Sequence, residues 1–432
     1  MKKIYQYILL VVAMVATASC SNELDDTLQP VNNGNLQFVV SDFPMFGEGT
    51  LTRAIGTQDE GKTAWENGDQ IIVTLISQKY GEQAAALTYD GSSWSTEASL
   101  SYLENETPSV SVFYAPCYEV TEEGTMQLRS GMQLGMTEYL SGNYEIENGI
   151  MTITFEGAIR TYSRLRIATM PEATLTVTTT DFTPAGATEV ATAAYTLTTD
   201  DNGNAFLYGV FAEDATISVK QGDITLKDYT FTVEKNPNGT EYNKSYALEA
   251  RPVIDGTLGG KTEATEDDIT ALVEQLKEYV DNGITTIIVP GSEPAMIDVG
   301  SLTITAIGEA IYRLSKEESY NGKIDLVLPD VTEIVDQEFY GARALNSINL
   351  PKVTTVGDGA FYDCQYLEEL TFGSVVTAIN HKLRAEFYKV GEKVEGCDLV
   401  LNREQVNAEA DYQPNIETRT WWNTEWKSIT LK

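Results

Sequence analysis

The chain has 432 residues and a formal net charge of −35. A charge of that sign repels nucleic acid and anionic membrane surfaces, so we expect no nucleic-acid partner. The length predicts about three domains, and the single histidine, His381, excludes histidine-dependent catalytic triads and two-histidine metal sites.

The first residues resemble a bacterial lipoprotein signal peptide. Lys2 and Lys3 give a positive start, and Ile8–Ala18 is an apolar run too short to span a bilayer stably. Small residues then precede Cys20, as in a lipobox, although Thr17 stands where that motif usually has Leu. The resemblance implies that residues 1–19 are removed and that Cys20 carries the lipid, a palmitate-type acyl anchor. The alternative is ordinary secretion of a soluble product.

Residues 20–35 are polar and have no periodic pattern, so we expect a lipidated tether. Glu23, Asp25 and Asp26 directly after the cysteine resemble the export signal of Bacteroides-type lipoproteins. That signal implies a surface-exposed lipoprotein of the cell outer membrane. No later stretch approaches about 20 consecutive apolar residues, so we expect no transmembrane helix.

From residue 36 to residue 252 the chain is rich in short β patterns separated by turn residues, which favours β-sandwich folds. This length is large for one sandwich, so we expect two in tandem, over residues 36–160 and 161–252. The expected strands are Leu36–Val40, Gln70–Ile76, Ser109–Tyr114, Met151–Phe155, Leu165–Ala168, Thr174–Thr179, Phe206–Phe211, Thr216–Lys220 and Tyr229–Val233.

A Gly-rich linker at 253–263 precedes a predicted amphipathic helix. Thr265 and Asp268 resemble a capping box, and apolar residues follow at helical spacing. Asn282-Gly283 supplies the C-terminal stop.

An internal repeat follows the helix. The segment starting at Leu328 matches the segment starting at Leu350 with a constant offset of 22 residues, and a weaker copy lies around Thr305–Tyr312. Each unit is expected to supply a short strand and an irregular return that carries a buried aromatic. Such units must stack, so residues 264–432 predict a solenoid with the helix as its N-terminal cap. Trp421, Trp422 and Trp426 lie at the other end.

Residues 21–250 resemble the fimbrillin family, the subunits of type V pili. The resemblance rests on Leu51-Thr52-Arg53-Ala54, on the strand entry Trp65–Ile71, on Ile153–Leu165 and on the closing segment Tyr242–Leu248. It implies two transthyretin-like sandwiches and assembly by donor-strand exchange with other fimbrillin subunits.

The repeat resembles the BspA-type leucine-rich repeat of bacterial surface proteins. Leu350–Leu367 follows its pattern closely, whereas the first copy has Val335, Glu338 and Ala342 at the usual Gly, Ala and Cys positions. The fold class implied as a whole is mainly β: two fimbrillin-type sandwiches followed by a short leucine-rich-repeat solenoid.

In fimbrillins a protease cuts behind an arginine and frees the first strand. Carried over, the resemblance implies cleavage between Arg53 and Ala54 and release of Leu36–Phe43, which opens a groove for a neighbour's strand. Here linker and solenoid follow the second sandwich, so no free donor strand ends the chain. A subunit that accepts a strand but gives none belongs at a fibre tip. The alternative for Arg53 is a solvated loop residue in a non-polymerising lipoprotein.

No pattern predicts catalysis, a cofactor or a metal, and we expect a binding protein rather than an enzyme. Asp200–Asn204 fits a hairpin turn better than a calcium loop, because its ligand spacing is wrong. Cys364 and Cys397 could form a bridge or pair with His381, but we expect them and Cys117 to be buried thiols. The three tryptophans Trp421, Trp422 and Trp426 could stack on sugar rings; the alternative is packing at the end of the solenoid.

The sequence therefore predicts a pilus-associated adhesin of the outer membrane and fimbrium, with a host or bacterial surface protein or glycan as its ligand. The alternative is a non-polymerising surface lipoprotein that binds such a ligand through its repeats.

Overall fold

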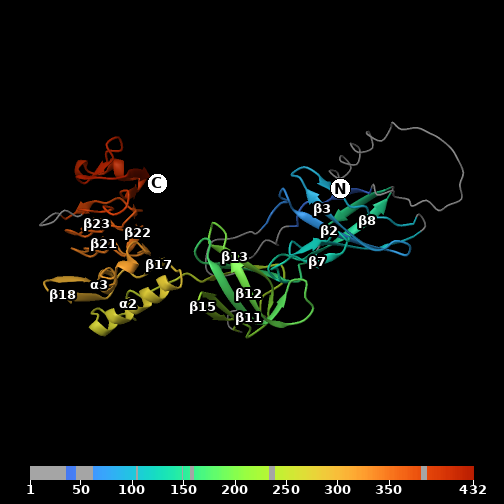
Figure 1. The fold of residues 1–432 in the computed structure, drawn as a ribbon, viewed down its shortest axis with the longest axis horizontal. Helices are drawn as coiled ribbons and strands as arrows, with labels where there is room; N and C mark the ends of the chain where they lie inside the picture. The colour runs from blue at the N-terminus through green and yellow to red at the C-terminus, as the bar shows by residue number, and fades with distance from the viewer. Residues whose placement is uncertain are drawn as a thin grey trace.

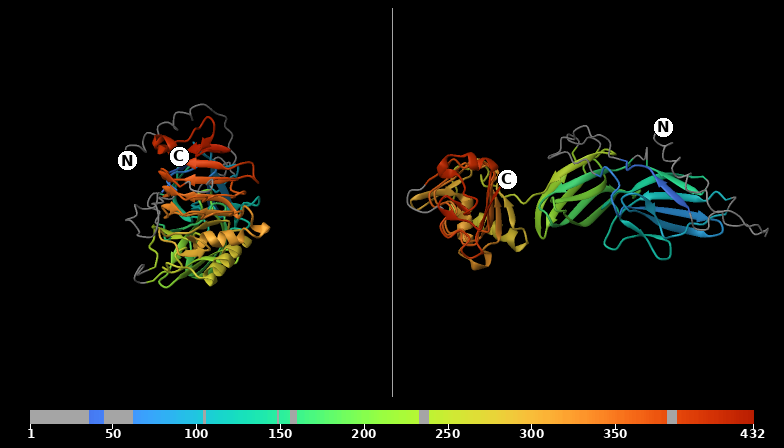
Figure 2. Two further views of the ribbon diagram at one scale, coloured as in Figure 1. Left: turned by 90° about the vertical axis from the view of Figure 1, so that its left-hand side faces the viewer. Right: turned by 90° about the horizontal axis from the view of Figure 1, so that it is seen from above.

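The structure is a computed structural model that describes residues 36–44, 62–103, 106–147, 149–155, 160–232, 239–380 and 387–432. The described chain is mainly β and forms three units that follow one another along the long axis of the molecule (Figure 1). The right-hand view of Figure 2 shows the same order from above. Among these residues no helix is long and apolar enough to cross a membrane.

The first unit contains β1 (Gln37–Val40), β2 (Gln70–Ser77), β3 (Gly81–Tyr89), β4 (Trp94–Ser95), β5 (Ser109–Tyr114), β6 (Tyr118–Val120), β7 (Met126–Leu128), β8 (Leu140–Glu147) and β9 (Ile150–Thr154). Seven strands form one sheet in the order β1-β9-β8-β5-β2-β3-β4, and β6 pairs with β7. The core includes Ile71, Val73 and Leu75, which alternate along β2. β1 is an edge strand and runs parallel to β9, with Gln37 opposite Ile150.

The second unit contains β10 (Ser163–Ala168), β11 (Thr174–Pro184), β12 (Ala191–Thr198), β13 (Asn204–Phe211), β14 (Thr216–Gln221), β15 (Ile224–Thr230) and β16 (Ser245–Glu249). The sheet order is β15-β14-β11-β13-β10-β16, with β12 paired to β11. Its own core includes Phe182 and Phe211, whose ring centroids are 4.4 Å apart. Asp200–Asn204 forms a turn between β12 and β13, but the expected hairpin is wrong, because β12 pairs with β11 and β13 pairs with β10 and β11 rather than with β12.

The predicted amphipathic helix is confirmed as α2 (Glu266–Asp281). Thr265 and Asp268 form the capping box in both directions, and Asn282 caps the C-terminus. Its buried residues Ile269, Leu272 and Leu276 follow helical spacing and face the third unit.

The third unit is built on parallel strands, with α2 along one side (Figure 1). One six-stranded sheet contains β17 (Thr286–Ile288), β20 (Ile324–Val327), β22 (Leu345–Leu350), β24 (Glu369–Phe372), β26 (Asp398–Leu401) and β29 (Ser428–Leu431) in that order. A second sheet contains β21 (Glu333–Ile334), β23 (Thr355–Val356) and β25 (Ala378–Ile379). Smaller elements are β18 (Met296–Val299) with β19 (Leu302–Thr305), β27 (Thr420–Trp421) with β28 (Thr424–Glu425), and the short helices η1 (Glu318–Tyr320), η2 (Arg403–Asn407) and η3 (Ala410–Tyr412).

The 22-residue offset of the sequence repeat appears as strand register. Leu326 pairs with Ile348, and Ile348 pairs with Leu370. The next partner in the row is Leu399, which belongs to a further copy with inserted residues. All four side chains are buried in one continuous core that extends to Trp426.

The prediction of a third, weaker repeat copy is wrong. The sequence predicts a strand and an irregular return around residues 305–312, but α3 (Ala306–Leu314) occupies this segment. The Thr305 side chain accepts a hydrogen bond from Gly308 N at 3.1 Å and caps the helix. Ile307, Ala310, Ile311 and Leu314 lie on its buried face. Their helical spacing overrides the weak likeness to the repeat.

Candidate functional site

The same two residues recur in three successive returns of the third unit: Phe339-Tyr340, Phe361-Tyr362 and Phe387-Tyr388. Each phenylalanine is buried, with at most 2% of its surface exposed, whereas Tyr388 is 48% exposed. Tyr340 and Tyr362 are half-buried. Each dipeptide therefore places one ring in the core and the next ring outside it, partly or largely exposed.

The three tyrosines form a continuous stack, which we call the tyrosine ladder. The ring centroids of Tyr340 and Tyr362 are 5.2 Å apart, and those of Tyr362 and Tyr388 are 5.0 Å apart. The ring planes of the first pair are inclined by only 11°. Because the rings cover one another's faces, a ligand would meet their edges and the phenol groups.

A second stack, formed by the three buried phenylalanines, supports the ladder on its core side. Phe361 lies between Phe339 and Phe387, with ring centroids 5.7 and 5.8 Å apart. Backbone hydrogen bonds also join successive returns, from Gly341 N to Tyr362 O at 2.7 Å and from Asp363 N to Tyr388 O at 2.8 Å. The tyrosine positions are thus set by the core and by the backbone, and they need little ordering before a ligand binds.

Cationic side chains border the ladder. Lys389 Nζ lies 5.5 Å from the Tyr388 ring centroid, and Arg343 pairs with Asp363 at 3.0 Å. At the other end Lys316 Nζ lies 3.9 Å from the ring centroid of Tyr312. Rigid aromatic edges with hydrogen-bonding groups beside them are typical of surfaces that bind proteins or glycans.

The tyrosine ladder is not among the sites expected from the sequence. The third Phe-Tyr pair follows the second by 26 residues instead of 22, because the copy carries an insertion. The dipeptide itself, found three times in the repeat region, is the signal that could have located it.

Two of the three expected ligand-binding tryptophans lie inside the core. Trp421 is 1% exposed and Trp426 is 2% exposed, and both rings contact Phe387. The indole Nε1 of Trp421 donates to Tyr412 O at 2.9 Å. A sugar ring cannot reach these buried faces, so the geometry favours the packing alternative for both.

Trp422 is the partly exposed member of the three. It stacks on Tyr412 with ring centroids 5.2 Å apart and planes inclined by 3°. Its backbone has φ of 48°, in the left-handed region, as part of the tight turn between β27 and β28.

The outer face of the six-stranded sheet carries a polar row. Asp325, Ser347, Glu369 and Asp398 are in register across four neighbouring strands. Ser347 Oγ donates to Asp325 at 2.7 Å, and Ser428 Oγ donates to Asp398 at 2.7 Å. This pattern is typical of a solvated sheet face.

β1 is held at the edge of the sheet by buried side chains and by hydrogen bonds to the residues that follow it. Leu36 and Phe43 are buried in the first core. Trp65 Nε1 donates to Ser41 O at 2.8 Å, and an Arg160 guanidinium nitrogen donates to Pro44 O at 2.7 Å. The proposed processing residues Arg53 and Ala54 and the lipidation residue Cys20 lie outside the described residues.

The three cysteines of the described chain are buried free thiols, as expected, and no Cys364–Cys397 bridge is present. Burial raises the pKa of both thiols above the ordinary value, so they are poor nucleophiles. His381 lies outside the described residues. Within the described ranges no group of three or more metal-ligating side chains is found.

Comparison with known proteins locates one family within the chain. Residues 322–390 match the BspA type leucine rich repeat region (6 copies). Among proteins of curated function, none matches the sequence. A candidate cell adhesion protein from Bacteroides fragilis NCTC 9343, of known crystal structure, is 11% identical with a TM-score of 0.27, over 51% of this chain and 90% of that chain. The C-terminal part of the chain thus contains a BspA-type leucine-rich repeat region.

Proposed function

We propose that this chain is a surface lipoprotein of the fimbrillin type that acts as a pilus-associated adhesin at the fibre tip. The repeat region, which we interpret as a leucine-rich-repeat solenoid, presents the binding surface. The single observation that carries the proposal is the tyrosine ladder, a row of three neighbouring rings held in place by a buried phenylalanine stack. The ladder belongs to the third unit, which lies at the opposite end of the molecule from the first unit (Figure 1).

The ladder suits binding because its position is set before any ligand arrives. A tyrosine adds a large amphipathic contact area at a small entropic cost, since it has few rotatable bonds. Tyr340, Tyr362 and Tyr388 are also held by each other, which lowers that cost further. The ligand is a surface protein or glycan of a host or of another bacterium.

The first two units are interpreted as fimbrillin-type, transthyretin-like sandwiches that can accept a donor strand. Among the described strands β1 pairs only with β9, so its loss would leave one edge of β9 unpaired and uncover the sites of Leu36 and Phe43. Cleavage after Arg53 would allow that loss. A strand from a neighbouring subunit would then restore the sheet.

This chain is less suited to donating a strand to a neighbouring subunit than to accepting one. β16 lies parallel to β10 with five residue pairs in register, from Ser245 opposite Arg164 to Glu249 opposite Ala168. The backbone continues through Ala250, whose N–H donates to Ala168 O at 2.8 Å, and on into the repeat region. A strand tied at both ends cannot reach another subunit, and this supports our proposal that the chain ends a fibre.

The alternative is a non-polymerising lipoprotein that uses the same ladder. It is favoured by the number of contacts that hold β1, among them the hydrogen bonds to Ser41 O and Pro44 O. In that case Arg53 is an uncut loop residue.

The adhesin role is tested with purified residues 21–432, which lack the signal peptide and the proposed lipid-bearing Cys20. Binding to a panel of immobilised extracellular-matrix proteins and to a glycan array is compared between wild type and Tyr362→Ser/Tyr388→Ser. The matched control is Tyr80→Ser/Tyr242→Ser, which removes two exposed tyrosines from the sheet units. We expect the ladder variant to lose at least about tenfold in affinity, or roughly 1.4 kcal/mol, and the control to keep it. Equal binding by all three proteins would rule out the ladder as the binding surface.

A further inference from the structure

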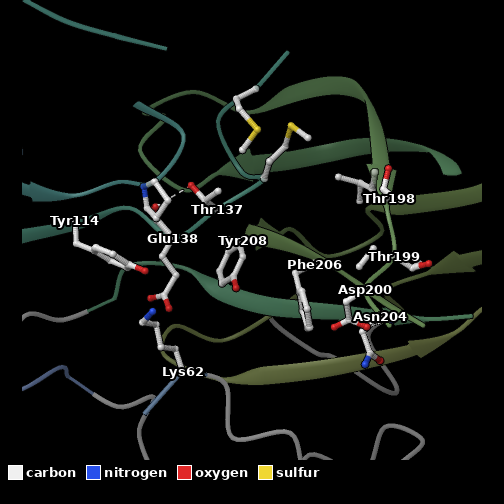
Figure 3. A pocket seen from close by; sticks show the side chains of 15 residues that line it. Lys62, Tyr114, Thr137, Glu138, Thr198, Thr199, Asp200, Asn204, Phe206 and Tyr208 are labelled. Carbon is white, nitrogen blue, oxygen red and sulfur yellow. Dashed lines mark hydrogen bonds between the residues drawn. The ribbon is translucent and has the colours of Figure 1, made fainter. Parts of the chain in front are cut away.

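A second candidate site lies between the first two units, far along the chain from the ladder. It is a cavity of about 420 Å³ (Figure 3). One wall comes from β13 of the second sheet, and the other comes from Tyr114, Glu138 and Lys62 of the first unit. The volume falls within the range of roughly 300–1,000 Å³ that is typical of small-molecule sites.

The β13 wall is aromatic although it lies on the outer face of its sheet. Asn204, Phe206 and Tyr208 alternate along the strand with the buried residues Ala205 and Leu207. Alternate residues of a strand share a face, so all three side chains line the cavity. Figure 3 shows the Phe206 and Tyr208 rings side by side along this wall.

Both rings are held from outside the cavity. The guanidinium carbon of Arg164, which is not a lining residue, lies 4.2 Å from the Phe206 ring centroid. The Tyr208 ring packs edge-on against Tyr162, with centroids 6.3 Å apart, and Tyr208 N donates to Gly135 O at 2.7 Å. The aromatic wall is therefore already in place before a ligand enters.

The first-unit end of the cavity is polar. Glu138 is only 5% exposed, and its Oε2 accepts from Arg160 Nε at 2.8 Å and from the Tyr162 hydroxyl at 3.0 Å. Lys62 Nζ lies 2.8 Å from Asp69. In Figure 3 the Tyr114 hydroxyl, the Glu138 carboxylate and the Lys62 ammonium point toward one another.

The charges at this end already have partners. Glu138 is paired with Arg160, and Lys62 is paired with Asp69. A charged ligand would lose part of its hydration here without gaining a counter-ion, which costs free energy. A wholly apolar ligand would strip water from these groups without replacing its hydrogen bonds. The site favours a neutral ligand that carries many hydroxyl groups.

At the opposite rim of the cavity, hydrogen bonds hold the backbone in place, and two polar side chains can bond to a ligand. Asp200 Oδ1 accepts from Asn202 N and Asn204 N, both at 2.9 Å, and holds the turn. The Asn204 carboxamide and the Thr198 hydroxyl make no hydrogen bond to any other described residue, so both can bond to a ligand.

We propose that this cavity is a carbohydrate-binding site for a short neutral glycan. The apolar face of a pyranose ring would lie against Phe206 and Tyr208, as sugar rings do on aromatic side chains. Its hydroxyl groups would bond to Glu138 and Lys62 at one end and to Asn204 at the other. The proposal is independent of the tyrosine ladder, because no residue is shared between the two.

The test uses residues 21–432 and three neutral probes, methyl α-mannopyranoside, methyl β-galactopyranoside and N-acetylglucosamine. Methyl glucuronide serves as the charged comparison. Saturation-transfer difference NMR and titration measure binding to wild type, to Phe206→Ala and to Asn204→Ala. Tyr242→Ala, an exposed tyrosine outside the cavity, is the matched control. Thermal melting of each variant checks that it is folded. If Phe206→Ala does not fold, binding by Asn204→Ala alone tests whether the cavity binds the probe.

We expect at least one probe to bind with a Kd of the order of 1 mM, and each cavity variant to weaken it by about tenfold, with no change in the control. Four outcomes would overturn the proposal. One is no saturable binding of any probe to wild type. Another is equal binding by wild type and both cavity variants. The third is loss of binding in Tyr362→Ser/Tyr388→Ser but not in the cavity variants, which would place the sugar on the ladder. Tighter binding of methyl glucuronide than of the neutral probes would contradict the preference for uncharged ligands.

Discussion

The ring of Tyr362 stacks on that of Tyr340 with centroids 5.2 Å apart, one repeat away along the chain. Directly beneath, Phe361 stacks on Phe339 at 5.7 Å. In each dipeptide the phenylalanine thus packs in the core, and the tyrosine that follows it lies in the outer stack. Substitutions at the two positions should therefore have separate effects on stability and on binding.

Phe361→Ala should destabilise the repeat region by about 3–5 kcal/mol, because a fully buried aromatic leaves a cavity when it is removed. Tyr362→Ala should cost only about 1 kcal/mol, since that ring is partly exposed. Urea unfolding of both variants, followed by tryptophan fluorescence, measures the difference. A Phe361 variant as stable as the Tyr362 variant would mean that the inner stack does not support the fold.

The pH dependence of stability should contain a contribution from Glu338. Its carboxylate is buried and accepts a hydrogen bond from Thr305 N at 3.1 Å, and burial raises its pKa to about 7. The unfolded chain has the ordinary value near 4.5, so the folded state binds more protons between these two values. Stability from this group is fully present below pH of about 4.5 and is lost as the pH rises through about 7, a change on the order of 3 kcal/mol.

Glu338→Gln keeps a hydrogen-bonding side chain and removes the titration. Relative to wild type, it should be equally stable at low pH and more stable above neutral pH. Urea unfolding of the two proteins at pH values on either side of this window gives the difference directly. Identical pH profiles would show that Glu338 does not titrate with a raised pKa.

Lipidation of Cys20 should be visible in whole cells. The wild type should incorporate labelled palmitate, Cys20→Ala should not, and Cys117→Ala should be labelled like the wild type because Cys117 is a buried thiol. Label that persists in Cys20→Ala would exclude this residue as the anchor.

Release of β1 can be tested with a peptide of known sequence. After cleavage at Arg53 and removal of the N-terminal fragment, a peptide that copies residues 36–44 should raise the melting temperature of the trimmed protein, because it binds only the native state. The uncut protein should not respond, since its own strand fills the site. A peptide with Phe43→Ala should bind more weakly, because Phe43 is 5% exposed and packs edge-on against Trp65 at 4.8 Å. No response of the trimmed protein to either peptide would contradict strand acceptance.

The sequence predicted the local elements best. The helix α2 was found with its caps, because Thr265, Asp268 and Asn282 act within one turn of the chain. The two exact repeat copies were found because a constant offset survives in the sequence. The copy with Phe387 was missed because inserted residues changed that offset, and α3 was mistaken for a repeat although Ile307, Ala310 and Ile311 have helical spacing.

The candidate sites could not be predicted in the same way. With 23 tyrosines in the chain, composition does not distinguish the three that stack. Their contact arises from parallel strand register between repeats, which is a tertiary property. The cavity beside Phe206 and Tyr208 depends on how two sheets pack together, and no pattern within either sheet encodes that arrangement.

If the chain is an adhesin at the tip of a fimbrial fibre, as we propose, its position in the native assembly should show it. Immunogold electron microscopy with antibodies against residues 322–390 should place gold at the free ends of fibres on the cell surface. Gold along the whole length of the fibres would identify a stalk subunit. Gold on the cell envelope away from any fibre would contradict the tip role and support the non-polymerising lipoprotein.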